Sequence, residues 1–249
     1  MSCPSSPSEA PQSFPRTRWS LVIAAISHNA PHSAAALETV CRDYWQPLYS
    51  YARRCGHSAH DAQDLTQGFF QHLLEKRWLD SADRDKGKLR SFLIVMLKRY
   101  MLNEWRRVSS LARGGGRAHV LFDAELAESR WAQDAGASIQ ADEAFDRAWA
   151  LTLLNLAIDR LRQESVAAGR PGDLEALKDG LMADRGAIDY SAVARQLGMS
   201  EGAARVAAHR LRKRFREVFR QEILQTLVEG TDLDAELRHL AAVLAKELP

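Results

Sequence analysis

The chain has 249 residues, of which 46% are hydrophobic and 27% are charged, and a formal net charge of +2. This length supplies enough apolar residues for one large or two small cores. No apolar run approaches membrane-spanning length, and three cysteines without a CxxC pair exclude a disulfide framework. Residues 2–15 lack the basic region and apolar core of a signal peptide. We therefore expect a soluble cytoplasmic protein.

The nearly balanced net charge hides a strong segregation of charge along the chain. Residues 84–107 carry a net charge of about +6, and residues 123–146 carry about −6. A second basic stretch follows at 205–220. Two basic blocks separated by an acidic one are typical of two nucleic-acid contacts joined by a linker.

The sequence predicts an all-α fold. Prolines are confined to the first fifty residues, Pro171 and the last position, and no alternating strand pattern occurs. We expect two small helical domains joined by a flexible acidic linker, with a helix-turn-helix in the second domain. The predicted segments are a disordered tail at 1–16, a first domain at 17–108, the linker at 109–140, a second domain at 141–222 and a C-terminal helical extension at 223–249.

A helix is predicted near residues 61–75. Asp61 and Asp64 suit its positively polarised first turn, and the apolar stripe behind them is predicted to be core. The edge formed by Asp61, Asp64 and Gln67 is left for a partner. The stripe comprises Leu65, Phe69, Phe70, Leu73 and Leu74.

A second predicted helix, near residues 89–107, interleaves basic and aromatic side chains on an apolar body. Cations can hold a nucleic-acid backbone while flat rings receive unstacked bases, so the pattern suits a strand-separating surface. The two aromatic residues that bear on this, Tyr100 and Trp105, belong to types that are more often core than base platforms.

Residues 189–216 have the residue pattern of a helix-turn-helix. Gly198 can end the first helix in a left-handed conformation. Ser200 is a good N-cap, and Glu201 places negative charge at the start of the second helix. That helix is strongly basic on one side, and we expect it to be apolar on the other, through Val206, Leu211, Phe215 and Val218. Past Arg220, apolar residues at helical spacing predict one or two further amphipathic helices after a break at Gly230.

Three of these stretches resemble the extracytoplasmic-function (ECF) group of bacterial RNA polymerase sigma factors. Asp61-Ala-Gln-Asp-Leu-Thr-Gln67 is similar to the group's Asp-Ala-Glu-Asp-Leu-Thr-Gln signature, and Leu89-Arg-Ser-Phe-Leu93 to its Phe-Arg-Ser-Trp-Leu. Residues 190–211 resemble its helix-turn-helix. The resemblance covers roughly residues 19–220 in the right order, and the extension at 223–249 lies beyond it.

The resemblance implies a role for each stretch. It implies contact with core RNA polymerase by Asp61, Asp64, Leu65, Gln67 and Phe70. It implies recognition and melting of the −10 promoter element by Arg90, Ser91, Lys98, Arg99, Asn103, Arg106 and Arg107. It implies recognition of the −35 element by Ser200, Glu201, Arg205, His209, Arg210 and Lys213.

The implied partners are core polymerase and promoter DNA, with an anti-sigma factor or a serine/threonine kinase as regulator. Thr66 or a nearby hydroxyl is a candidate for phosphorylation. The extension is either an added helix packed on the second domain or a regulator that covers a polymerase or DNA surface. Gln63 replaces the group's Glu, and Arg99 and Asn103 stand where it has Asn and Asp. These departures bear on polymerase docking and on −10 preference.

Two other classes of function were weighed. An enzyme with a metal centre would need His57, His60, Asp61, Asp64 and His72 to converge, but two of these precede the helix and no supporting partners are evident. We therefore expect no enzyme activity, metal, cofactor or small-molecule substrate. The alternative is a stand-alone helix-turn-helix regulator with a ligand-sensing N-terminal domain, which would bind an operator without polymerase.

Overall fold

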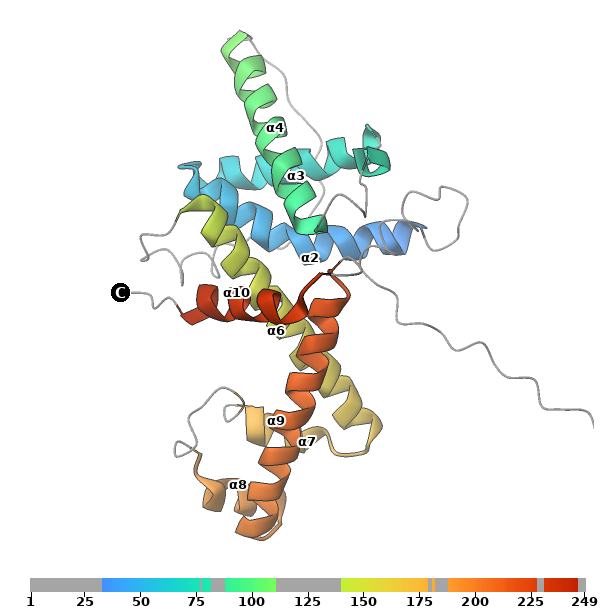
Figure 1. Ribbon diagram of the computed structural model, residues 1–249, viewed down its shortest axis with the longest axis vertical. Coiled ribbons are helices and arrows are strands. Elements are labelled where there is room, and N and C mark those ends of the chain that lie inside the picture. The colour runs from blue at the N-terminus through green and yellow to red at the C-terminus, as the bar shows by residue number, and fades with distance from the viewer. Residues whose placement is uncertain are drawn as a thin grey trace, which may run out of the picture.

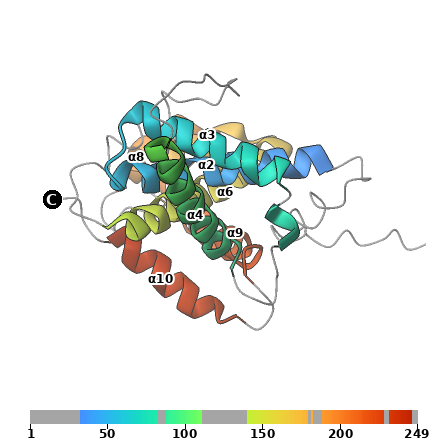
Figure 2. The ribbon, with the colours of Figure 1, turned by 90° about the horizontal axis from the view of Figure 1, so that it is seen from above.

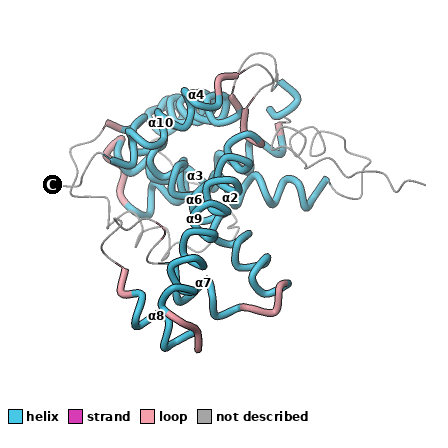
Figure 3. The backbone as a smooth tube through the Cα atoms, turned by 60° about the horizontal axis from the view of Figure 1, so that its bottom comes forward, coloured by secondary structure: helices cyan, strands magenta, loops and turns pink. Residues whose placement is uncertain are grey.

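The computed structural model describes residues 33–76, 78–81, 88–110, 140–178, 181, 188–227 and 231–245. Within these ranges the chain forms helices and no strand, which confirms the all-α prediction (Figure 3). The predicted tail at 1–16, nearly all of the predicted linker at 109–140 and the break at Gly230 lie outside the described residues.

The described helices form an elongated molecule (Figure 1). Helices α2, α3 and α4 make up one end, α7 and α8 lie at the other, and α6 and α9 run between the two ends. The elements are α2 (Ser33–Arg54), α3 (Ala59–Glu75), the 3-10 helix η1 (Trp78–Ser81), α4 (Leu89–Ser110), α6 (Ala141–Ala167), α7 (Pro171–Leu177), α8 (Tyr190–Leu197), α9 (Glu201–Leu224) and α10 (Leu233–Ala245).

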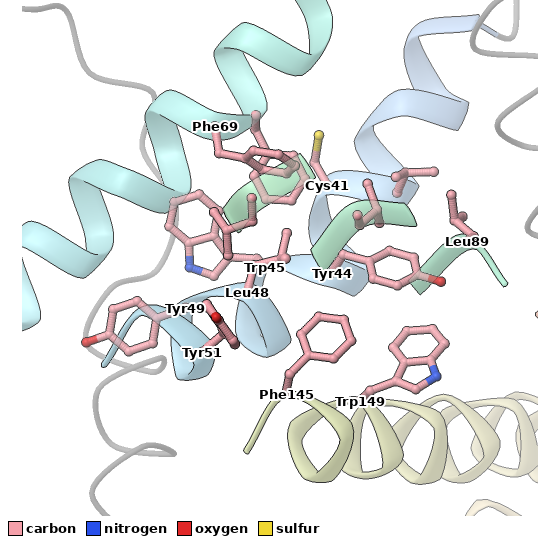
Figure 4. Packing of buried hydrophobic residues seen from close by; sticks show 14 of the residues in the cluster. Cys41, Tyr44, Trp45, Leu48, Tyr49, Tyr51, Phe69, Leu89, Phe145 and Trp149 are labelled. Atoms are coloured by element: carbon pink, nitrogen blue, oxygen red, sulfur yellow. The ribbon is translucent and has the colours of Figure 1, made fainter. Parts of the chain in front are cut away.

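The main core is aromatic and joins α2, α3 and α4 to the first half of α6 (Figure 4). Tyr44 of α2 stacks on Trp149 of α6 with ring centroids 4.5 Å apart and planes 10° apart. Both side chains are almost fully buried. The structure thus adds a connection that the predicted division at residue 141 did not include, because Trp149 and Phe145 belong to the first domain's core.

Two smaller clusters build the far end of the molecule. Phe215 and Val218 of α9 pack with Ala157 and Leu161 of α6 and with Leu174 of α7. The second cluster is made mainly of small side chains, which allow α8 and α9 to approach closely. Its buried members are Leu177, Val193, Ala194, Ala204 and Ala208.

Helix α10 lies against the main core rather than against the far end. Leu240 and Val243 are its buried apolar residues. Arg147 of α6 donates through Nη1 to the carbonyl oxygens of Val243 and Leu244, each at 3.3 Å, and so satisfies carbonyls at the end of α10. Side chains as well as apolar packing therefore fix this helix in place.

Gly68 sets how closely α3 and α4 approach. A Cβ at this position would overlap the phenol oxygen of Tyr100 and lie 3.3 Å from its Cζ. Tyr100 is 3% exposed and has little room to move. We expect Gly68→Ala to lower the free energy of unfolding by about 1 to 2 kcal/mol, because the overpacking exceeds the gain in helix propensity. Urea unfolding measures this change.

The matched control for Gly68→Ala is Gly202→Ala in α9. Nothing lies within 4 Å of a Cβ added at Gly202, so that substitution should be neutral or slightly stabilising. Adding Tyr100→Phe to Gly68→Ala should recover part of the loss. A Gly68→Ala protein as stable as the Gly202→Ala protein would show that α3 and α4 do not pack this closely.

Candidate functional site

The polar start of α3 is an exposed acidic edge. Ser58 caps the helix: its hydroxyl accepts a hydrogen bond from the Asp61 amide at 3.1 Å and donates to Asp61 Oδ2 at 2.7 Å. Asp61 and Asp64 are both exposed. His60 Nδ1 lies 3.3 Å from Asp64 Oδ2. Two carboxylates are therefore presented to solvent near the start of α3, with Asp61 in the first turn and Asp64 in the second.

The other residues predicted for this edge are less accessible. Gln67 is 8% exposed and Phe70 is 3% exposed. Phe70 stacks on Trp45 with ring centroids 5.9 Å apart, and Leu65 is half-buried against the main core. Gln67 and Phe70 could contact a partner directly only if α3 moved away from the core. In this conformation both side chains pack beneath the acidic edge.

Thr66 is fully buried, and its hydroxyl donates to the carbonyl oxygen of Ala62 at 2.7 Å. A kinase cannot reach this side chain in the folded protein. The expectation of phosphorylation at Thr66 is therefore wrong for this conformation. The exposed hydroxyl near the acidic edge is that of Ser58.

Two basic residues in the first half of α4 pair with carboxylates of other helices. Near the start of the helix, Arg90 is 9% exposed and faces carboxylates of α6 and α10. Lys98 lies 2.7 Å from Asp142 Oδ1 and 5.4 Å from the ring centroid of Tyr51. Sequence reasoning did not identify these acidic partners, because they lie far away in the chain.

The second half of α4 projects away from the body of the molecule and is open to solvent (Figure 1). Trp105 is 67% exposed and Leu102 is 47% exposed. Tyr100, by contrast, is core. The predicted residues that are exposed on α4 are Ser91, Lys98, Arg99, Asn103, Arg106 and Arg107. A solvent-exposed Trp among cations is suited to stacking with an unpaired base.

The turn between α8 and α9 forms as its residues predict. Asp189 caps α8 by accepting hydrogen bonds from the amides of Ser191 and Ala192, each at 3.0 Å. The hydrogen bond from the Ser191 hydroxyl, followed by that from the Ala192 amide, holds the pKa of the Asp189 carboxyl below its usual value. Gly198 is left-handed with φ of 63°, and Ser200 caps α9.

Arg205 is held in a defined position near the start of α9. Its guanidinium carbon lies 4.8 Å from the ring centroid of Tyr190, and it pairs with Glu201 one turn earlier. The side chain is 60% exposed. An arginine fixed by a ring and a carboxylate keeps its planar fork for hydrogen bonding without being free to sample many rotamers.

Other polar side chains of α9 extend the exposed face around Arg205. His209, Arg210 and Lys213 are exposed, whereas Arg214 turns inward to Glu164 of α6, with Nη2 2.7 Å from Oε1. That hydrogen bond is the main reason why the pKa of Glu164 lies below its usual value. Val206 is 49% exposed, so its assignment to the apolar stripe is wrong, whereas Phe215 and Val218 are buried as predicted. The buried face also includes Ala204 and Ala208.

None of the described helices is both long and apolar enough to cross a membrane. In the part of the chain that the structure describes, no three His, Cys, Asp or Glu side chains are arranged to hold a metal ion. His60 and Asp64 form a pair rather than part of a larger cluster.

The helices α2 to α4 thus present an exposed acidic edge and a basic helix with an exposed Trp. Residues 41–110, from α2 to the end of α4, match the family model described as Sigma-70 region 2. The match covers 70 of the 249 residues, so it likens this part of the chain to region 2 of sigma-70 proteins. No curated protein and no solved structure matches the chain.

Proposed function

We propose that the protein is an ECF-type sigma factor that binds core RNA polymerase and directs it to promoters with defined −35 and −10 elements. The observation that carries this proposal is the combination of the region 2 match at 41–110 with a capped helix-turn-helix whose second helix is basic and exposed. The region 2 match by itself supports only the broader family, so the −35 assignment rests on the helix-turn-helix in the second half of the chain.

The proposed −35 reader is the exposed face of α9. A helix of this kind enters the major groove with its first turns against base edges, while later cations contact phosphates. Arg205 is positioned in the second turn, where a bidentate contact to guanine fits its planar fork. Ser200 and Glu201 lie at the helix start, and His209, Arg210 and Lys213 follow along the exposed side.

The proposed −10 surface is α4. Trp105 would receive an unpaired base, while the cations Arg99, Arg106 and Arg107 approach the backbone of the opened strand. Asn103 is exposed beside them and offers amide hydrogen bonds to a base edge. Arg90, Ser91 and Lys98 would extend this surface toward the start of the helix. Among these seven, the buried Arg90 requires a change of conformation before it can meet DNA.

The proposed polymerase contact is the acidic edge of α3, formed by Asp61 and Asp64 and supported by Leu65, Gln67 and Phe70. Polymerase would also hold the two DNA-contacting surfaces at the separation of the promoter elements, so promoter affinity should depend on it. Such a protein acts in the cytoplasm. Regulation by an anti-sigma factor or a serine/threonine kinase remains an expectation from the resemblance.

The docking edge is tested by binding of the full-length protein to purified bacterial core polymerase in size-exclusion chromatography. We expect Asp61→Asn combined with Asp64→Asn to weaken the complex about tenfold or more, because the proposed contact loses two negative charges. Asp159→Asn combined with Glu175→Gln, which removes two exposed carboxylates from α6 and α7, is the charge-matched control. Equal binding by the two variants would remove α3 from the polymerase contact.

A further inference from the structure

The start of α10 lies beside the start of α4, where Glu236 meets Arg90 of the proposed −10 surface and Lys88, the residue before α4 (Figure 2). Glu236 is 3% exposed. Its Oε1 lies 2.7 Å from Arg90 Nη1, and its Oε2 pairs with Lys88 Nζ. The buried carboxylate of Glu236 therefore forms ion pairs with two side chains that lie 146 and 148 residues away in the chain.

The start of α6 adds two more carboxylates to the same surface. Asp146 Oδ1 lies 3.7 Å from Arg90 Nε, and Asp142 Oδ1 lies 2.7 Å from Lys98 Nζ. Asp146 also lies 2.9 Å from His239 of α10. The acidic side chains of α6 and α10 thus form one group around the cations at the first half of α4.

These contacts are of a kind that a phosphate could replace. Arg90 Nη1 lies 2.7 Å from Glu236 Oε1, but the pair does not have the geometry of a hydrogen bond. Burying an ion pair costs desolvation energy that only good geometry offsets. A phosphate group could take the place of a carboxylate at an arginine and offer better-aligned acceptors.

We propose that α10, together with Asp142 and Asp146, is an intramolecular cover on the −10 surface, and that promoter phosphates and Glu236 compete for Arg90 and Lys88. This inference rests on the proposed function. In the covered state the first half of α4 presents neutralised cations, while Trp105 and the far half of α4 stay exposed. Engagement of the promoter by the polymerase-bound protein then displaces the start of α10.

The test measures binding of the full-length protein to a fluorescent forked duplex DNA by anisotropy, without polymerase. We expect Glu236→Gln to bind about threefold to tenfold more tightly than the wild type, because it releases two cations for phosphate. Asp234→Asn is the matched control: it removes the same charge from α10, but its partner is Arg220 of α9, at 3.1 Å. Equal affinities for the two variants would overturn the proposal.

A double variant separates competition from simple loss of structure. Adding Arg90→Gln to Glu236→Gln should remove much of the gain in affinity, since only Lys88 of the two released cations then remains. A gain that persists undiminished in the double variant would contradict the assignment of Arg90. If Glu236→Gln does not fold, amide hydrogen exchange of the wild type replaces it. Exchange in residues 233–245 should accelerate when core polymerase and forked promoter DNA are added together, and unchanged protection would overturn the proposal.

Failure of this inference is distinguishable from failure of the proposed function. A wild-type protein that binds no promoter even with core polymerase would reject the sigma-factor function. A wild-type protein that binds promoters with polymerase, but whose DNA affinity is indifferent to Glu236→Gln, would reject only the cover.

Discussion

Replacing Trp149 with Ala should lower the free energy of unfolding by about 3 to 5 kcal/mol, the usual cost of deleting a large buried aromatic side chain. The Trp149 side chain is fully buried and stacks on Tyr44 of α2. It joins the second half of the chain to the core of the first, so its removal leaves a cavity at that joint. For a chain of this size the melting temperature should fall by roughly 10 °C.

The control for Trp149→Ala is Leu151→Ala on the same helix. Leu151 is 37% exposed, and its truncation should cost less than about 1 kcal/mol. Guanidinium unfolding of both variants gives the comparison. Similar losses for the two variants would show that Trp149 is solvated in solution, and that the region 2 helices and α6 do not share a core.

Replacing Arg205 with Ala should lower promoter binding by the polymerase-bound protein by about 1 to 3 kcal/mol and relax specificity at one position of the −35 element. The physical reason is the loss of a bidentate base contact from a side chain that Tyr190 and Glu201 hold in place. Affinities for a set of duplexes, each altered at one −35 base pair, measure both effects.

Lys213→Ala should act differently, because a phosphate contact carries no sequence information. It should weaken binding to all promoters alike and reduce the dependence of log affinity on log salt by about one phosphate contact. Arg162→Ala is the control, since Arg162 belongs to α6 and pairs with Asp159 and Glu175. Equal losses for Arg205→Ala and Lys213→Ala on every sequence would contradict the division between base reading and phosphate contact.

Local structure was the most predictable part of this protein. The helix expected near 61–75 is α3 at Ala59–Glu75, and the turn at Gly198 and the cap at Ser200 form as their chemistry indicates. These features depend on neighbours a few residues away. Backbone conformation at a glycine and capping by a hydroxyl are set within one turn of helix, so the sequence pattern contains the information needed to predict them.

Tertiary partners were less predictable, and α4 shows why. Tyr100 and Trp105 lie five residues apart in one helix, yet one is 3% exposed and the other 67%. Five residues of helix place the two rings about 140° apart around α4, but only the packing of α3 against α4 decides that the side with Tyr100 is the covered one. Arg90 is a similar case, since its burial depends on Glu236 of α10 and Asp146 of α6. Helical periodicity says nothing about partners so distant in the chain.

The most direct test of the proposed function is run-off transcription with the purified full-length protein, bacterial core polymerase and the DNA upstream of its own coding sequence. The account predicts a discrete transcript that requires the protein and is lost when Asp61→Asn and Asp64→Asn are combined. Tight, specific binding to that DNA by the protein alone, with no transcript when polymerase is added, would contradict it and favour a stand-alone helix-turn-helix regulator.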